Sequence, residues 1–218
     1  MSSNTQTARR SAMNVRTMAQ IGMLGAVAMV LMFFEIPLWF APPFYKIDLS
    51  ELPVLIGCFA MGPVAGVLIE LVKILLYVVV HGTTTAGVGD IANFLIGCSF
   101  IVPAGLIYQF KKTRKGAMAA LTAGTLLMSV TAIVGNALVM LPFYSNFMPL
   151  ENIIAAGAAI NPAVSNVWTF AFICVGPFNV IKGIVVSVIT TLVYKHISAM
   201  IHSIGTERGN RQSRKLRA

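Results

Sequence analysis

The chain has 218 residues, of which 57% are hydrophobic and only 11% are charged. A soluble domain carries about 25% charged residues, so this composition excludes an ordinary soluble enzyme and indicates an integral membrane protein. The formal net charge is +9, from 16 basic and seven acidic residues, and its distribution along the chain separates a nucleic-acid-binding surface from a membrane topology signal.

The sequence predicts an all-α membrane protein with six transmembrane helices, because six apolar stretches are separated by polar or proline-containing segments. The first stretch ends before Pro37. The apolar run from Glu51 to Val80 is too long for one span and is interrupted by Met61-Gly62-Pro63, so it predicts a short helix followed by a full span. The predicted helices cover residues 17–34, 51–60, 63–80, 90–108, 117–141 and 178–200.

Local signals set the predicted limits of three helices. Asp48 and Glu51 have the spacing of a capping box at the start of the second helix. Pro142 is expected to end the fifth helix, and Pro177 to occupy the first turn of the sixth, where proline is favoured. Residues 163–176 are too few to span a bilayer by themselves, so we predict no additional span there.

The positions of the basic residues predict the orientation. Basic clusters precede the first helix, follow the fourth and follow the sixth, whereas the opposite loops contain one cation, Lys46. By the positive-inside rule, both termini are predicted to be cytoplasmic. The chain is thus divided into a basic tail over residues 1–16, a membrane domain over 17–204 and a second basic tail over 205–218. No nucleic-acid partner is expected. The expected partner is the lipid bilayer, and the orientation of the chain in it explains the excess of basic residues.

Polar side chains inside apolar helices point to functional sites, because burying them in a bilayer is costly. Glu70 and Lys73 are three residues apart and can neutralise each other on one helix face. Asn93 lies in the first turn of its predicted helix, where it can cap the preceding loop or face a ligand. Asn136 lies deeper, where it can bond a neighbouring helix or a ligand.

Asn179 and Lys182 are the most informative pair of polar residues. They share one face of the sixth predicted helix, and no acidic residue lies within helical reach of Lys182. The lysine must therefore find an acceptor in another segment, in water, in a ligand with carbonyl oxygens, or at the membrane surface by snorkelling.

Several catalytic patterns are absent from the sequence. There is no GxxxxGK[ST] phosphate-binding loop and no HExxH motif, and no serine has a plausible histidine and acid partner in the membrane. Three widely spaced cysteines in apolar runs argue against both disulfides and a zinc site. We therefore expect no enzyme activity, no bound metal and no cofactor.

Five segments, in this order, resemble the riboflavin-specific substrate-binding subunits (S components) of energy-coupling factor (ECF) transporters. They are KID with ELPVLIGCFAMGPVAGVLIELVK, HGTTTAGVGDIANFLIG, PAGLIY with KKTRKGA, NALVMLPFY, and GPFNVIKG. The resemblance covers most of residues 17–200. It implies a subunit of the bacterial plasma membrane that captures riboflavin, with FMN and analogues as further candidates, in a pocket near the outer face.

The same resemblance implies the site residues and the partners. Flavin contacts are implied on the first outer loop and on spans four to six. The implied ligand-binding residues are Phe44, Tyr45, Lys46, Asp48, Asn93, Asn136, Asn179 and Lys182. The implied partners are a transmembrane coupling subunit and two cytoplasmic ATPases, which alone use ATP. Gly22 and Ala26 match the docking motif of the family, Ala-xxx-Ala, with glycine in place of the first alanine.

Two other function classes remain open from the sequence. A self-sufficient secondary carrier of a small vitamin-like solute needs an unpaired acid in the membrane, for which Glu70 is the deep candidate. A membrane enzyme or structural protein is the third class, and no catalytic constellation supports an enzyme.

Overall fold

The structure is a computed structural model that describes residues 15–39, 41–42, 45–83, 87–147 and 149–193. Within these residues the protein is helical apart from one two-stranded antiparallel ribbon, β1 (Ile36–Pro37) and β2 (Lys46–Ile47). The helical elements are α1 (Val15–Met32), α2 (Glu51–Met61), α3 (Pro63–His81), α4 (Val88–Phe110), α5 (Arg114–Gly135), η1 (Asn136–Met140), α6 (Leu141–Tyr144), α7 (Leu150–Ala158), α8 (Val167–Phe170) and η2 (Ala171–Val175). Helix continues after η2 over residues 176–193.

Five helical runs in the described part of the chain are long and apolar enough to cross a membrane. They are Val15–Met32, Pro63–His81, Val88–Phe110, Arg114–Tyr144 and Val167–Val193. This confirms the prediction of an all-α, multi-pass membrane protein. The shorter apolar helix α2 has 11 residues, against about 20 for a full span, so length by itself does not confirm the sixth predicted span.

The break between α2 and α3 follows the sequence signal closely. Gly62 has a φ of 105°, a conformation that residues with a side chain rarely adopt, and Pro63 starts α3. The capping box predicted at the start of α2 is wrong. The N-cap is Ser50, and its side chain makes no capping hydrogen bond. The Asp48 carboxylate accepts the Ser50 N–H, while Glu51 turns to Lys73.

The predicted roles of Pro142 and Pro177 are also wrong. Helix continues past Pro142 to Tyr144, and the last long helix begins at Val167, ten residues before Pro177. A π-helical turn precedes each proline: Leu141 N–H donates to Asn136 O, and Gly176 N–H donates to Ala171 O. Because a proline lacks an N–H and crowds the preceding turn, these wider turns let the helix continue through it.

The start of the last helix has its own sequence signal. Asn166 and Thr169 form a capping box, in which each side chain accepts the backbone N–H of the other residue. Residues 167–176 thus form the first part of this helix rather than a separate span. The connection before it also contains α7, which the sequence analysis did not predict.

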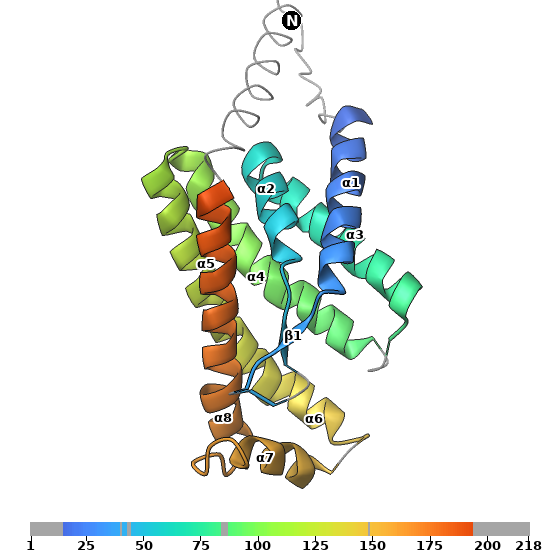
Figure 1. Ribbon diagram of the computed structural model, residues 1–218, viewed down its shortest axis with the longest axis vertical. Helices are drawn as coiled ribbons and strands as arrows, with labels where there is room; N and C mark the ends of the chain where they lie inside the picture. The colour runs from blue at the N-terminus through green and yellow to red at the C-terminus, as the bar shows by residue number, and fades with distance from the viewer. Residues whose placement is uncertain (1–14, 40, 43–44, 84–86, 148, 194–218) are drawn as a thin grey trace, which may run out of the picture.

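The described elements form two groups at opposite ends of the molecule (Figure 1). α6, α7 and α8 lie at one end, and the strands run between this end and the ends of α1 and α2. The start of α1, the connection from α4 to α5 and the last described turn, near residue 193, lie at the other. Both predicted basic tails lie almost entirely outside the described residues, as does the predicted end of the sixth helix at residue 200.

The two largest of three apolar clusters in the described part of the chain hold this arrangement together. The larger cluster joins the five helices α1, α2, α3, α4 and α5. Its buried side chains include Leu55, Ile69 and Phe100. The smaller one surrounds Phe170 and Cys174 at the end that carries α7 and α8. Ile96 of α4 packs against both of these clusters and also lines a cavity.

Candidate ligand-binding site

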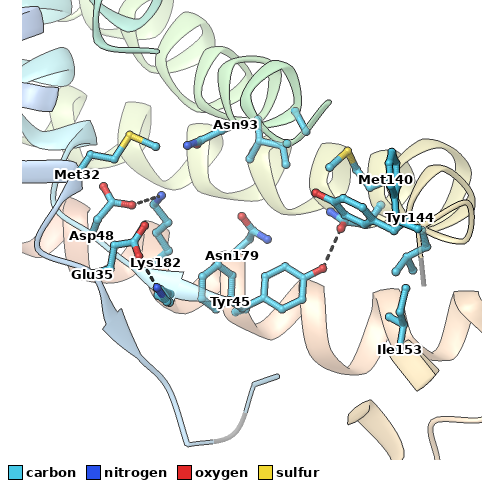
Figure 2. A pocket seen from close by; sticks show the side chains of 18 residues that line it. Met32, Glu35, Tyr45, Asp48, Asn93, Met140, Tyr144, Ile153, Asn179 and Lys182 are labelled. Atoms are coloured by element: carbon cyan, nitrogen blue, oxygen red, sulfur yellow. Dashed lines mark hydrogen bonds and ion pairs between the residues drawn. The ribbon is translucent and has the colours of Figure 1, made fainter. Parts of the chain in front are cut away.

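A cavity of about 540 Å³ opens among the strands, α4, the η1–α6 segment, α7 and the last helix. This volume falls within the range of about 300–1,000 Å³ that is typical of small-molecule sites. Its walls are mostly apolar, and Figure 2 shows a small number of polar side chains that reach into it. The elements that form it are far apart in the sequence, so the site exists only in the folded protein.

An ion pair between Asp48 and Lys182 forms one wall of the cavity. Lys182 Nζ lies 3.0 Å from Asp48 Oδ2, although the two residues are 134 positions apart. The acceptor that Lys182 requires is therefore an acid on another segment. A lysine ammonium has three donors, so Lys182 can hold Asp48 and still donate to a ligand.

The environment of Asp48 keeps its carboxylate charged. Burial by itself raises the pKa of a carboxyl group, but the charges of Lys182 and Lys73 and hydrogen bonds from Ser50 outweigh it and lower the pKa of Asp48 to about 2. Asp48 is therefore ionised at neutral pH, and its attraction fixes the ammonium of Lys182 at the cavity wall.

Asn179 lies one helical turn before Lys182 and presents an amide to the cavity. Its Nδ2 donates to Val175 O over 2.9 Å. Its Oδ1 and second N–H have no hydrogen-bond partner among the described residues, and Figure 2 shows the side chain between the Asp48–Lys182 pair and Tyr45. This wall therefore combines an acceptor with two kinds of donor, the amide and the ammonium.

Asn136 and Tyr45 form a second polar part of the cavity wall. Asn136 Nδ2 donates to Ala132 O over 2.8 Å, and Asn136 Oδ1 accepts the Tyr45 hydroxyl over 2.8 Å. Burial, with smaller contributions from Tyr144 and Cys174, raises the pKa of Tyr45, so its hydroxyl remains a donor. Asn136 belongs to the π turn η1, and Asn179 follows the π turn η2, which agrees with the frequent occurrence of such turns at functional sites.

The cavity brings together seven of the eight ligand-binding residues implied by the sequence. Tyr45, Lys46, Asp48, Asn93, Asn136, Asn179 and Lys182 line it. Phe44 lies outside the described residues. The sequence analysis missed Glu35, Phe147 and Ile153, which also line the cavity. The only sequence signal for Glu35 was that it is an acidic residue two positions before Pro37. No sequence signal pointed to Ile153, which lies on the unpredicted helix α7.

Glu70 and Lys73 pair as the sequence predicted, but in a larger cluster outside the cavity lining. Lys73 Nζ lies 2.7 Å from Glu70 Oε1 and 2.9 Å from Glu51 Oε1, and all three side chains are almost fully buried. Ser50 accepts a further hydrogen bond from Lys73 over 3.3 Å. The role of Glu51 was not foreseen.

Removing the Tyr45 hydroxyl is expected to weaken ligand binding through Asn136. In Tyr45→Phe the Asn136 amide loses the partner that holds its orientation, so we expect ligand affinity to fall about 3- to 10-fold, with a loss of about 1 kcal/mol in stability. Binding titrations and thermal unfolding measure the two effects. Tyr77→Phe, outside the cavity lining, is the control and should leave affinity unchanged.

Comparison with known proteins places the chain among transporter subunits. The family model described as ECF transporter, substrate-specific component, matches residues 16–194. The riboflavin transporter RibU of Staphylococcus aureus (strain TCH60) is 35% identical over 185 residues, which cover 84% of this chain and 91% of the relative. The riboflavin transporter FmnP of Bacillus subtilis (strain 168) is 31% identical, with 84% and 92% coverage. A solved S component of a bacterial ECF transporter shares 33% identity and a TM-score of 0.67, covering 85% of this chain and 97% of that one.

Proposed function

Because this chain belongs to the family of ECF transporter substrate-specific components, we propose that it is the membrane subunit that binds riboflavin for uptake. The observation that carries the proposal is the polar wall formed by Asn179 and by Lys182, which Asp48 holds in place, in a largely apolar cavity. Riboflavin is bound as the transported solute, and we propose that the chain has no cofactor of its own.

The polar wall has the chemistry that the flavin ring requires. The pyrimidine edge of the ring presents an N–H between two carbonyl oxygens. Asn179 can accept from the N–H and donate to one carbonyl, and Lys182 can donate to the other. Asn136 supplies a further amide across the cavity, while Tyr45, Tyr144 and Phe178 offer aromatic surface to the ring.

We propose that the energy for transport comes from other subunits. The sequence has no GxxxxGK[ST] motif for binding nucleotide phosphates. We propose that a transmembrane coupling subunit and two cytoplasmic ATPases complete the transporter, as the family assignment implies.

We also propose that α2 serves as a sixth crossing, so that both termini are cytoplasmic, and that the cavity opens toward the outer side. In support, the start of α1 and the connection from α4 to the first turn of α5 lie at the end of the molecule opposite α7 (Figure 1). These segments carry Arg16, Lys111, Lys112, Arg114 and Lys115. The positive-inside rule assigns that end to the cytoplasm. The cavity, lined by β2 and α7, belongs to the other end.

Gly22 and Ala26 form the surface that we propose for docking on the coupling subunit. Both are exposed on α1, and a side chain added at Gly22 would meet nothing within 4 Å. Small residues four apart let a second helix approach closely. We expect Gly22→Leu or Ala26→Leu to reduce co-purification of the coupling subunit at least about tenfold, while riboflavin affinity stays unchanged.

Two control variants test this docking surface. Ala119→Leu adds the same bulk to an exposed position of α5 and should leave co-purification intact. Gly25→Leu should destabilise the fold instead, because a Cβ at Gly25 would lie 2.5 Å from Val72 Cγ1. Unchanged co-purification in both Gly22→Leu and Ala26→Leu would place the docking surface elsewhere.

Riboflavin uptake into reconstituted vesicles tests the proposed function as a whole. Vesicles that contain this chain, the coupling subunit and the ATPases should accumulate riboflavin when ATP is supplied. Vesicles with this chain alone should not accumulate it. Accumulation against a gradient by this chain alone would contradict the proposal and favour the secondary carrier.

A further inference from the structure

A second ion pair lines the cavity on its more exposed side. Lys46 Nζ lies 2.6 Å from Glu35 Oε2; Lys46 is the first residue of β2, and Glu35 directly precedes β1. The exposed fractions of their side chains are 43% and 31%, against 11% and 8% for Lys182 and Asp48. We refer to Glu35 and Lys46 as the mouth pair. The mouth pair is not among the groups proposed to contact the flavin ring.

The chain geometry places the two ion pairs along one wall. Lys46 and Asp48 are two residues apart around β2 and both line the cavity, whereas Ile47 between them is buried against Ala41 and Phe178. Lys46 pairs with Glu35, and Asp48 pairs with Lys182. Among the described lining residues, these two acids and two bases balance, so the cavity has no excess positive charge to offer.

This balance suits a neutral ligand and opposes a phosphorylated one. Riboflavin carries no charge, and its ribityl chain ends in a hydroxyl group. Phosphorylation of that hydroxyl gives FMN and adds about −1.5 to −2 charges at pH 7. A phosphate is strongly hydrated, so it should favour the most exposed polar part of the cavity, where it meets the Glu35 carboxylate and a lysine that is already neutralised.

We propose that the mouth pair makes the cavity select riboflavin over its phosphorylated form, an inference that rests on the proposed function. Glu35 repels the phosphate and holds Lys46, which is the cation that could otherwise bind it. Lys182 cannot substitute, because Asp48 holds it on the more buried side.

The test compares the dissociation constants of riboflavin and FMN for the purified full-length protein, measured by quenching of flavin fluorescence. The wild-type protein should bind FMN at least about tenfold more weakly than riboflavin. Glu35→Gln keeps Lys46 and removes the repelling carboxylate, so the ratio of the FMN to the riboflavin dissociation constant should fall at least about fivefold. Lys46→Gln removes the cation and leaves the Glu35 carboxylate, so the ratio of the FMN to the riboflavin dissociation constant should increase.

Two controls isolate the charge of the mouth pair. Glu151→Gln removes an exposed acid outside the cavity lining and should leave the ratio unchanged. For the wild-type protein, raising the salt concentration should lower the ratio of the FMN to the riboflavin dissociation constant without affecting riboflavin binding. The mouth pair is partly exposed, so dissolved ions screen its charges.

Three outcomes would overturn the proposal: equal wild-type affinities for the two flavins, an unchanged ratio in Glu35→Gln, or loss of riboflavin binding in Glu35→Gln. The last would mean that the pair supports the cavity rather than selects its ligand. Failure of wild-type protein to bind either flavin would contradict the proposed function instead.

Discussion

Lys73→Met is expected to prevent stable folding of the protein. Lys73 lies at the centre of three almost fully buried charges, with Glu70 and Glu51 as its ion-pair partners. Without the ammonium, two carboxylates would face each other in the apolar interior. Removing one partner of a buried ion pair costs about 3–5 kcal/mol, a large part of the stability of a typical domain. The yield of monodisperse protein in detergent and its thermal unfolding measure the loss.

Glu70→Gln provides the matched contrast to Lys73→Met. Glu70 Oε2 and Glu51 Oε2 have no hydrogen-bond partner among the described residues, so the cluster holds more carboxylate than Lys73 can satisfy. Glu70→Gln leaves a balanced pair of Glu51 and Lys73, and we expect it to fold with a change of less than about 1 kcal/mol. Equal damage from Lys73→Met and Glu70→Gln would show that packing, rather than charge balance, determines stability there.

The same variant separates the riboflavin-binding subunit from the secondary carrier. A proton-coupled carrier would depend on a membrane acid such as Glu70. In the structure this acid pairs with Lys73 and lies outside the cavity lining. We therefore expect Glu70→Gln to keep riboflavin binding and ATP-driven uptake.

Lys182→Met is expected to weaken both ligand binding and the fold. A hydrogen bond to a charged group contributes about 1.5–3 kcal/mol, so riboflavin affinity should fall about 10- to 150-fold. The substitution also leaves Asp48 without its ion-pair partner, and the Asp48 residue as a whole is only 6% exposed. Stability should therefore fall by about 3–5 kcal/mol. Lys182→Arg should bind weakly as well, since a guanidinium fork does not fit the place of an ammonium.

The double variant Asp48→Asn/Lys182→Met separates these two effects. It removes both buried charges, so stability should recover most of the loss seen in Lys182→Met. Riboflavin affinity should remain low because the donor is still absent. Wild-type affinity in the double variant would remove Lys182 from the site and leave its pair with Asp48 as a purely structural contact.

The features that could be predicted from the sequence are those that depend on composition and on short-range signals. Low charge content indicated the membrane class, and Gly62-Pro63 located the break between α2 and α3. The i, i+3 spacing of Glu70 and Lys73 and of Asn179 and Lys182 also reported correctly which side chains share a helix face. Each of these signals acts within a few residues of chain, where helix geometry is known in advance.

The errors arose where backbone geometry or a contact from another segment overrides a local rule. Pro142 was expected to end one helix and Pro177 to begin another, but each follows a π-helical turn through which the helix continues. Glu51 has capping-box spacing, but a buried lysine attracts its carboxylate away from the helix N-terminus. The requirement of Lys182 for an acceptor could be deduced. Its identity could not, because Asp48 reaches it only through the approach of β2 to the last helix.

Titration of the purified chain with riboflavin, without ATP or partner subunits, tests the central claim most directly. Flavin fluorescence is expected to be quenched in a saturable manner with one flavin per chain, and Asp48→Asn/Lys182→Met should show at least about tenfold weaker binding in the same assay. Folded, monodisperse wild-type protein that leaves riboflavin fluorescence unquenched at all concentrations, with no flavin retained on gel filtration, would contradict the assignment of this chain as the riboflavin-binding subunit.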